Sequence, residues 1–181
     1  MSGSFIKCPD QKVKLPYKMS ADPISPPPRP LPALLTGVKL AAVDKLRGRI
    51  ADAGHPDIRE GHGCVFGFID LDKGSRLTDL AANAGLTKQA VGEAVSELER
   101  IGYVTRVPDP QDGRAKIIKL TDRGMDAVIK GRRIFAEIER EWAEQIGPEL
   151  MASFREAATR IAALEGVRTE AGGRETGRRA A

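Results

Sequence analysis

The stretch that decides the fold is YVTRVPDPQDGRAKIIKLT, residues 103–121. Residues 103–107 and 117–120 are rich in β-branched and aromatic side chains, which favour strands. Proline, aspartate and glycine dominate the residues between them, and these are turn formers. The stretch therefore predicts a β-hairpin. Its tip is longer than the two-residue Asp-Gly turn that a plain hairpin needs, and it ends in Arg114, so we expect the tip to project.

The residues immediately upstream, RLTDLAANAGLTKQAVGEAVSELERIG (76–102), predict two short helices joined by a glycine turn. Thr78 and Thr87 are placed to cap the two helices, because a threonine hydroxyl can accept an N–H of the first helical turn. Gly85 permits the sharp turn between them. The second helix has an apolar face at the spacing i, i+4 and i+7, formed by Val91, Val95 and Leu98. Two helices joined in this way form a helix-turn-helix, and the hairpin that follows makes it a winged helix.

Helical apolar spacing continues through the flanking residues. On the N-terminal side it predicts a helix over residues 33–54. The run DIREGHGCVFGFIDLD (57–72) predicts a buried helix, with a strand as the open alternative because Gly63 and Gly67 each cost a helix about 1 kcal/mol relative to alanine. On the C-terminal side the spacing predicts two helices within residues 121–165, separated by a glycine-proline break, and Thr121 is placed to cap the first of them.

Both ends of the chain differ in composition from the middle. Residues 1–32 include the run PISPPPRPLP, which is poor in backbone donors and favours polyproline II, and residues 166–181 are polar. We expect both to be disordered tails around one domain, residues 33–165. No apolar run approaches the roughly 20 residues of a membrane-spanning helix, and the N-terminus lacks the apolar centre of a signal peptide. We therefore expect a cytoplasmic protein with no membrane partner.

Several classes of function find no support in the sequence. It has no Gly-rich phosphate loop, HExxH or GxSxG motif, so we do not expect an enzyme. Cys8 and Cys64 form no CxxC or Cys/His cluster, so we expect no metal and no cofactor. Cys64 lies in an apolar run, which indicates a buried thiol rather than a redox sensor. Residues 76–120 carry seven Lys and Arg against six Asp and Glu, so bulk charge alone does not indicate a nucleic-acid partner.

A local group of side chains is more informative. In helix-turn-helix proteins the N-terminal part of the second helix enters the DNA major groove, where glutamine can pair with adenine and lysine with guanine or phosphate. A projecting arginine beside it can enter the narrow minor groove, and Asp112 can hold the guanidinium of Arg114 in place. Glu93 is unfavourable near phosphates unless it accepts from a cytosine or pairs with an arginine. We expect the DNA-binding residues to be Thr87, Lys88, Gln89, Gly92, Ser96, Arg106, Asp112, Arg114 and Lys116.

The segment LTDLAANAGLTKQAVGEAVSELERIGYVTRVPDPQDGRAKIIKLTDRG, residues 77–124, resembles the winged helix-turn-helix of the MarR-family transcriptional regulators. The helix pair, the wing and the LTDRG start of the next helix carry the resemblance, which extends more loosely over residues 33–165. It implies a mainly α (α+β) fold in which N- and C-terminal helices form a dimerisation region. It also implies that Arg114 is the wing arginine and Asp112 its acidic partner. Glu93 departs from the basic residue common at its position.

The resemblance implies an obligate homodimer, and the sequence supports this independently. The helices within residues 121–165 are more apolar than a lone winged helix needs, so they can form a two-fold interface together with residues 33–54. Two such lobes would read a pseudo-palindromic operator with half-sites about one helical turn apart. The residues expected at the interface are Leu34, Val38, Trp142, Leu150, Phe154, Ile161 and Leu164.

Regulation and the alternative function complete the expectations. Many MarR-family members release DNA when a small phenolic or anionic ligand binds, so the resemblance implies a repressor with a small-molecule effector. His55, His62 and Trp142 are candidates for lining an effector pocket, although a structural role is the simpler interpretation of each. The alternative is a winged helix that has lost DNA binding and serves as a protein-interaction module. The acidic residues that would suit this alternative are Glu93, Glu97 and Glu99.

Overall fold

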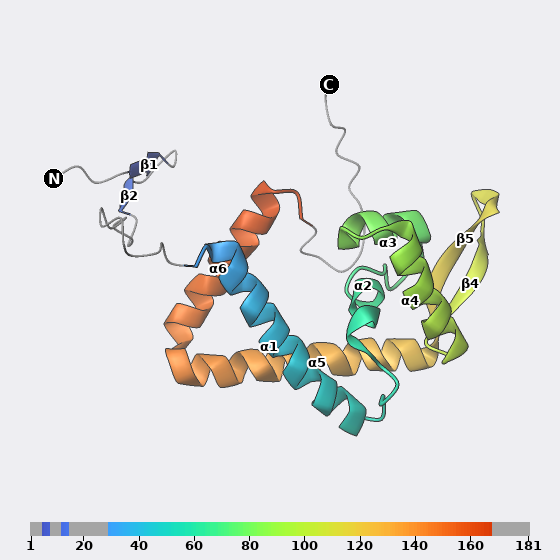
Figure 1. Cartoon of the computed structure of the whole chain (residues 1–181), viewed down its shortest axis with the longest axis horizontal. Coiled ribbons are helices and arrows are strands. Elements are labelled where there is room, and N and C mark those ends of the chain that lie inside the picture. Colours follow the sequence, from blue (N-terminus) through green and yellow to red (C-terminus); the bar gives the residue numbers. More distant parts are fainter. Residues whose placement is uncertain (1–4, 8–11, 15–28, 168–181) are drawn as a thin grey trace. The chain divides into compact units, whose positions relative to one another are not determined.

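The computed structural model describes residues 5–7, 12–14 and 29–167, and Figure 1 shows its helices and strands. The chain divides into two units, residues 1–39 and residues 40–181. Within the described ranges, no helix has both the length and the apolarity to cross a membrane.

The first unit contains a short antiparallel strand pair and the beginning of a helix. Strand β1 (Phe5–Lys7) pairs with β2 (Lys12–Lys14), and Ile6 lies opposite Val13. The expectation of a disordered tail over residues 1–32 is therefore wrong at these two strands, since both contain β-formers that favour pairing. Residues 15–28, with most of the proline-rich run, lie outside the described residues, as does the C-terminal segment from residue 168.

The second unit is mainly helical and contains one small sheet. Helix α1 (Leu31–Asp52) continues into it from the first unit. The sheet is antiparallel with the strand order β3-β5-β4, so the hairpin gains a third strand from upstream. The mainly α, winged helix-turn-helix fold expected from the sequence is confirmed. The elements after α1 are η1 (Glu60–His62), α2 (Gly63–Phe66), β3 (Ser75–Arg76), α3 (Leu77–Ala84), α4 (Lys88–Arg100), β4 (Val104–Asp109), β5 (Asp112–Leu120), α5 (Asp122–Ile146) and α6 (Pro148–Leu164).

Local signals place most of these boundaries. Thr87 caps α4, since its hydroxyl accepts the Ala90 N–H at 3.2 Å, and Thr121 caps α5 through the Gly124 N–H at 3.1 Å. Gly85 ends α3 in the left-handed conformation, with φ of 66°, which glycine adopts without steric cost. All three features were expected from the sequence.

Two local expectations are wrong. The residue at the N-cap of α3 is Arg76, two positions before Thr78, and its side chain makes no capping hydrogen bond. The buried helix expected within residues 57–72 is reduced to the single turn η1 and the four-residue α2, and no strand forms there. Gly63 and Gly67 bound that short helix, in keeping with the poor helix propensity of glycine.

Two apolar clusters hold the second unit together. The larger lies inside the winged helix, where α2, α3, α4, the sheet and the start of α5 meet. Its fully buried members include Leu80, Val91, Leu98, Tyr103 and Ile118. The smaller joins α1 to α5 and contains Ile50, Ile134 and Ile138, with Trp142 packed against them. The core therefore fixes α4 against the sheet and leaves the opposite side of α4 exposed.

Candidate nucleic-acid interface

A concave surface of about 370 Å³ lies where the start of α4 meets the wing. Five of its side chains are cationic and come from β3, α4, β4 and β5, so the fold gathers on one face charges that are scattered over 41 residues of sequence. Four of the residues expected to bind DNA border it. The lining residues are Arg76, Leu77, Thr78, Lys88, Arg106, Arg114, Ala115, Lys116 and Ile118.

The N-terminal turn of α4 presents Lys88 and Gln89 to solvent. Gln89 Nε2 donates to Glu93 Oε1 at 3.2 Å, one helical turn along. Glu93 is therefore engaged by an amide on its own helix. Gly92 is half-buried, and a Cβ there would meet Leu77 Cδ2 at 3.7 Å, an ordinary contact. Packing within the chain does not require glycine at this position.

Arg106 is held within the chain. Its Nη1 pairs with Glu99 Oε2, and its Nη2 donates to Ser96 Oγ at 3.0 Å. Ser96 Oγ in turn donates to the Gly92 carbonyl at 2.8 Å. Both Ser96 and Arg106 were expected to contact DNA, but the structure places them in a link between strand β4 and helix α4. This link fixes the base of the wing against the second helix.

The wing tip differs from expectation in one contact. Asp112 Oδ1 accepts the backbone N–H of Arg114 at 3.1 Å, and no ion pair joins the two side chains among the described contacts. The carboxylate therefore shapes the turn and does not hold the guanidinium. Arg114 is exposed at the edge of the concave surface.

The cations of the concave surface fall into two groups. Arg106 is paired with Glu99, and Arg76 with Asp109. Within the part of the chain that the structure describes, no ion pair engages Lys88, Arg114 or Lys116. These three exposed charges, one on α4 and two on the wing, are free to meet an external anion.

Arg76 and Asp109 are site residues that the sequence reasoning missed. Asp109 is 5% exposed; its Oδ2 accepts a hydrogen bond from Arg76 Nε at 2.7 Å and lies 2.5 Å from Arg76 Nη2 in an ion pair. The backbone N–H of Gln111, followed by the Arg76 guanidinium, holds the pKa of Asp109 below its usual value, against the opposing effect of burial. One sequence signal could have pointed to this pair: Arg76 stands at the start of a predicted helix, a position where Ser, Thr, Asp and Asn are the preferred residues.

Residues 60–115, from η1 to the wing, match the model of the MarR family. This segment is similar to the MarR family of transcriptional regulators. The match spans both helices of the helix-turn-helix and most of the wing, which is the region where the sequence resemblance is most specific.

One curated protein and two solved structures are also similar to this chain. The "HTH-type transcriptional regulator BilQ" of Clostridioides difficile (strain CD3) is 25% identical over 88 residues, which cover 46% of this chain and 60% of that protein. The apo form of MarR from E. coli is 19% identical with a TM-score of 0.62, over 74% of this chain and 97% of that one. The transcriptional repressor CouR, bound to a 23-mer DNA duplex, is 21% identical with a TM-score of 0.60, over 74% and 92%. At these identities the two structures establish the fold.

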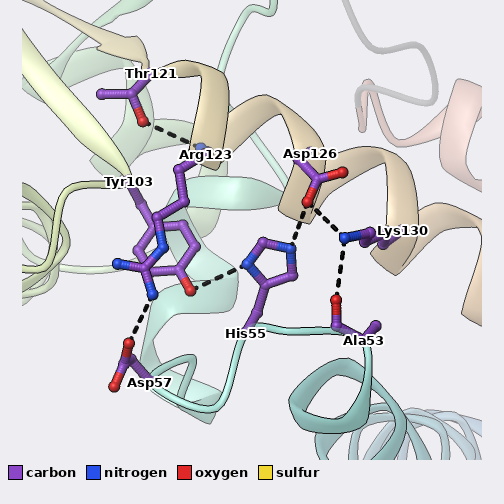
Figure 2. A network of polar contacts seen from close by, with 9 residues as sticks. Ala53, His55, Asp57, Tyr103, Thr121, Arg123, Asp126 and Lys130 are labelled. Atoms are coloured by element: carbon purple, nitrogen blue, oxygen red, sulfur yellow. Dashed lines mark hydrogen bonds and ion pairs between the residues drawn. The ribbon is translucent and has the colours of Figure 1, made fainter.

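Two buried histidines, His55 and His62, join the winged-helix lobe to the residues after α1. Figure 2 shows the first: His55 Nδ1 lies 3.1 Å from Tyr103 Oη, and His55 Nε2 lies 2.9 Å from Asp126 Oδ2 on α5. Asp126 also accepts from Lys130 at 2.7 Å. The hydrogen bond from Lys130, followed by that from His55, lowers the pKa of Asp126 despite its partial desolvation.

The network continues from Tyr103 to the start of α5. The guanidinium of Arg123 lies over the Tyr103 ring, 4.3 Å from its centre. Arg123 also donates to the Ile101 carbonyl at 2.6 Å and to Asp57 Oδ2 at 2.8 Å. One arginine therefore joins the end of α4, the segment after α1 and helix α5, and Figure 2 shows its contact with Asp57.

The second histidine holds α4 itself. His62 Nδ1 accepts the Arg59 backbone N–H at 3.1 Å, so the proton lies on Nε2, which donates to Glu97 Oε2 at 3.1 Å. Arg59 Nη1 pairs with the other Glu97 oxygen at 3.0 Å. The His62 hydrogen bond, with Arg59 beside it, lowers the pKa of Glu97 below 4.5. Both histidines thus occupy structural positions, and neither borders the concave surface.

The residues expected at a dimer interface fall into two groups. No residue of α6 is buried within the chain, and exposed apolar side chains line it, with Leu164 exposed by 84% and Leu150 by 60%. Trp142 instead packs against the small cluster of its own chain, so it borders no effector pocket that the structure describes. The other exposed members of the expected set are Leu34, Val38, Phe154 and Ile161.

Cys64 is the cysteine that lies within the described residues. It is half-buried, its Sγ donates to the Gly61 carbonyl at 3.0 Å, and burial raises the pKa of the thiol. These properties favour the unreactive thiol form. Cys8 lies outside the described residues.

Proposed function

We propose that the protein is a transcriptional regulator that binds double-stranded DNA through the concave surface between α4 and the wing. The observation that carries this proposal is the set of three unpaired cations on one face, Lys88, Arg114 and Lys116. The DNA-bound CouR structure shares the fold, and the similar protein BilQ is named a transcriptional regulator.

The proposed contacts follow from the geometry of B-DNA. Helix α4 enters the major groove with its N-terminal turn, where the partial positive charge of the helix N-terminus favours phosphate oxygens. Gln89 then reaches base edges, and Lys88 contacts phosphate or guanine. Arg114 at the wing tip enters the adjacent minor groove, where the negative potential is strongest. Ser96, Arg106 and Asp112 act by shaping the surface.

We further propose that the regulator is a cytoplasmic homodimer that acts as a repressor on a pseudo-palindromic operator. The exposed apolar stripe of α6 supports the dimer, because contiguous apolar surface of this kind marks an interaction site. Residues 33–54 and 121–165 would form the dimerisation region, and residues 76–120 the DNA-binding lobe. Release by a small phenolic or anionic effector is part of the proposal.

The test is fluorescence anisotropy with a labelled duplex from upstream of the protein's own coding region, against a scrambled duplex, across a salt series. We expect tight binding to the native duplex, with log affinity falling steeply against log salt as phosphate contacts release counterions. Arg114→Ala should weaken binding roughly 5- to 150-fold, about 1–3 kcal/mol. Lys119→Ala removes an exposed cation on the same strand outside the concave surface and should have a much smaller effect. Equal, weak and salt-insensitive binding to both duplexes would favour a protein-interaction module instead.

A further inference from the structure

The wing loses its third strand halfway along its length. Strand β3 is two residues long and pairs with β5 through Ser75 opposite Ile118 and Arg76 opposite Ile117. Beyond Ile117, the wing is a ribbon of β4 and β5 alone. Two-stranded ribbons are marginally stable in water, so the distal half needs a further contact to hold its direction.

The backbone of the distal half is also weakly paired. Pro108 has no N–H to donate, and the register shifts between Pro108 and Asp109. The tip side chains from Pro110 to Arg114 are exposed. The link from Arg106 to Glu99 and Ser96 anchors the ribbon close to its base. This link by itself does not restrain the tip of the wing.

The Arg76–Asp109 pair supplies a contact at the distal end. Arg76 lies on β3 at the start of α3, and Asp109 is the last residue of β4, on the far side of β5. The Arg76 side chain therefore spans the width of the sheet, and its guanidinium donates one hydrogen bond through Nε and forms an ion pair through Nη2 with one oxygen of the buried carboxylate. The other carboxylate oxygen accepts the Gln111 backbone N–H at 2.8 Å, which ties the turn to the same group.

The position of Arg76 in the chain strengthens this interpretation. It occupies the N-cap of α3, where a side-chain oxygen would accept a backbone N–H of the first turn. Arginine has no acceptor, and the structure shows no capping hydrogen bond from it. Helix α3 therefore lacks a side-chain cap at Arg76, and the arginine side chain contacts Asp109 instead.

We propose that Arg76 and Asp109 are positioning residues that hold the wing at the angle from which Arg114 reaches the minor groove. This inference rests on the proposed function. Preorganised contacts lose less freedom on binding, so a wing held in place should bind DNA more tightly than one that swings. The competing role is a direct contact of Arg76 with a phosphate, since its side chain is 41% exposed on the concave surface.

The two roles predict opposite signs for Asp109→Asn. If Arg76 contacts phosphate directly, the substitution frees a cation and removes a negative charge, so binding should tighten. If the pair positions the wing, binding should weaken although the surface has become more positive. Asp79→Asn removes a charge from the first turn of α3, outside the pair, and serves as the matched control. We expect it to leave operator binding unchanged or slightly tighter.

Operator binding should be measured for D109N, R76Q, R76K and the double variant R76Q/D109N, with folding and oligomeric state checked by circular dichroism and sedimentation. We expect each single variant to weaken binding by a similar factor, up to about 100-fold, as if the Arg114 contact were lost. The double variant should lose no more than either single one. Arg76→Lys keeps the charge but loses the two-pronged geometry, so it should not restore binding. Tighter binding of D109N, or full binding of R76K, overturns the proposal.

Hydrogen exchange of the free protein separates this proposal from the proposed function. In R76Q and D109N, amides of residues 109–116 should exchange faster than in the wild type, while those of the α4 core stay protected. If the wild type shows no specific binding to any duplex but exchange behaves as described, the proposed function fails and the structural link stands. Unchanged exchange at the tip in D109N overturns the link whatever the DNA result.

Discussion

Gly124 offers the sharpest test of how the lobe is packed. It is the third residue of α5, and a Cβ built on it would lie 2.0 Å from the Tyr103 carbonyl oxygen and 3.1 Å from Leu120 Cδ2. Any residue can adopt the helical backbone conformation of Gly124, so conformation does not require glycine here. Glycine is needed because the start of α5 lies close to the backbone of Tyr103, the residue before strand β4. We predict that Gly124→Ala destabilises the protein.

The magnitude follows from the geometry. Cβ atoms essentially never approach other atoms closer than 3.0 Å, so the start of α5 must move by about 1 Å. Overpacking of this kind costs about 1–3 kcal/mol. The movement also strains the hydrogen bond that the Thr121 N–H donates to the Tyr103 carbonyl at 3.1 Å. Such a hydrogen bond contributes about 1 kcal/mol to stability. Alanine returns about 1 kcal/mol through helix propensity, which leaves a net loss of about 1–3 kcal/mol.

The control is Gly131→Ala in the same helix. A Cβ there would meet nothing in the chain within 4 Å, so only the propensity gain applies and the protein should become up to about 1 kcal/mol more stable. Urea unfolding at fixed protein concentration measures both, since the stability of a dimer depends on concentration. The Gly124→Ala midpoint should fall by roughly 0.5–1.5 M at an m-value near 2 kcal/mol/M. Stabilisation by both substitutions would refute the close approach.

Three further predictions concern the network, its titration and the interface. Tyr103→Phe keeps the ring packing but leaves the buried Nδ1 of His55 without a partner, so urea unfolding should show a loss of about 1–3 kcal/mol. The lowered pKa of Glu97 means that its contribution to stability is present above pH 4.5 and is lost as the pH falls through and below that value. Glu97→Gln should therefore flatten the acid side of the stability–pH curve, and an unchanged curve would contradict the His62 and Arg59 contacts. Phe154→Asp should convert the proposed homodimer to monomers in sedimentation velocity, because it places a charge in the exposed apolar stripe of α6; a dimer that persists would mean the interface lies elsewhere.

Local chemistry explains why the winged helix was predictable. Each boundary that the sequence places correctly depends on one residue acting on its own backbone: the Thr87 and Thr121 hydroxyls on nearby amides, and the positive φ of Gly85. Strand β3 has no such signal. Its two residues become a strand only because β5 lies beside them, and this pairing joins positions more than 40 residues apart. A separation of 33 residues likewise concealed the Arg76–Asp109 pair.

The candidate site shows the limit of reasoning from charge. The near balance of seven basic and six acidic residues in 76–120 reveals nothing about a partner, because a sequence does not say which charges neutralise one another. The fold decides this. It pairs Asp109 with Arg76, Glu99 with Arg106 and Glu97 with Arg59. Arg106, an expected DNA contact, is therefore held by a carboxylate of its own chain. Lys88 at the start of α4 and Arg114 and Lys116 on the wing make no ion pair within the described residues. A lobe of almost no net charge can thus present a surface that is locally cationic, and the proposed function depends on that separation.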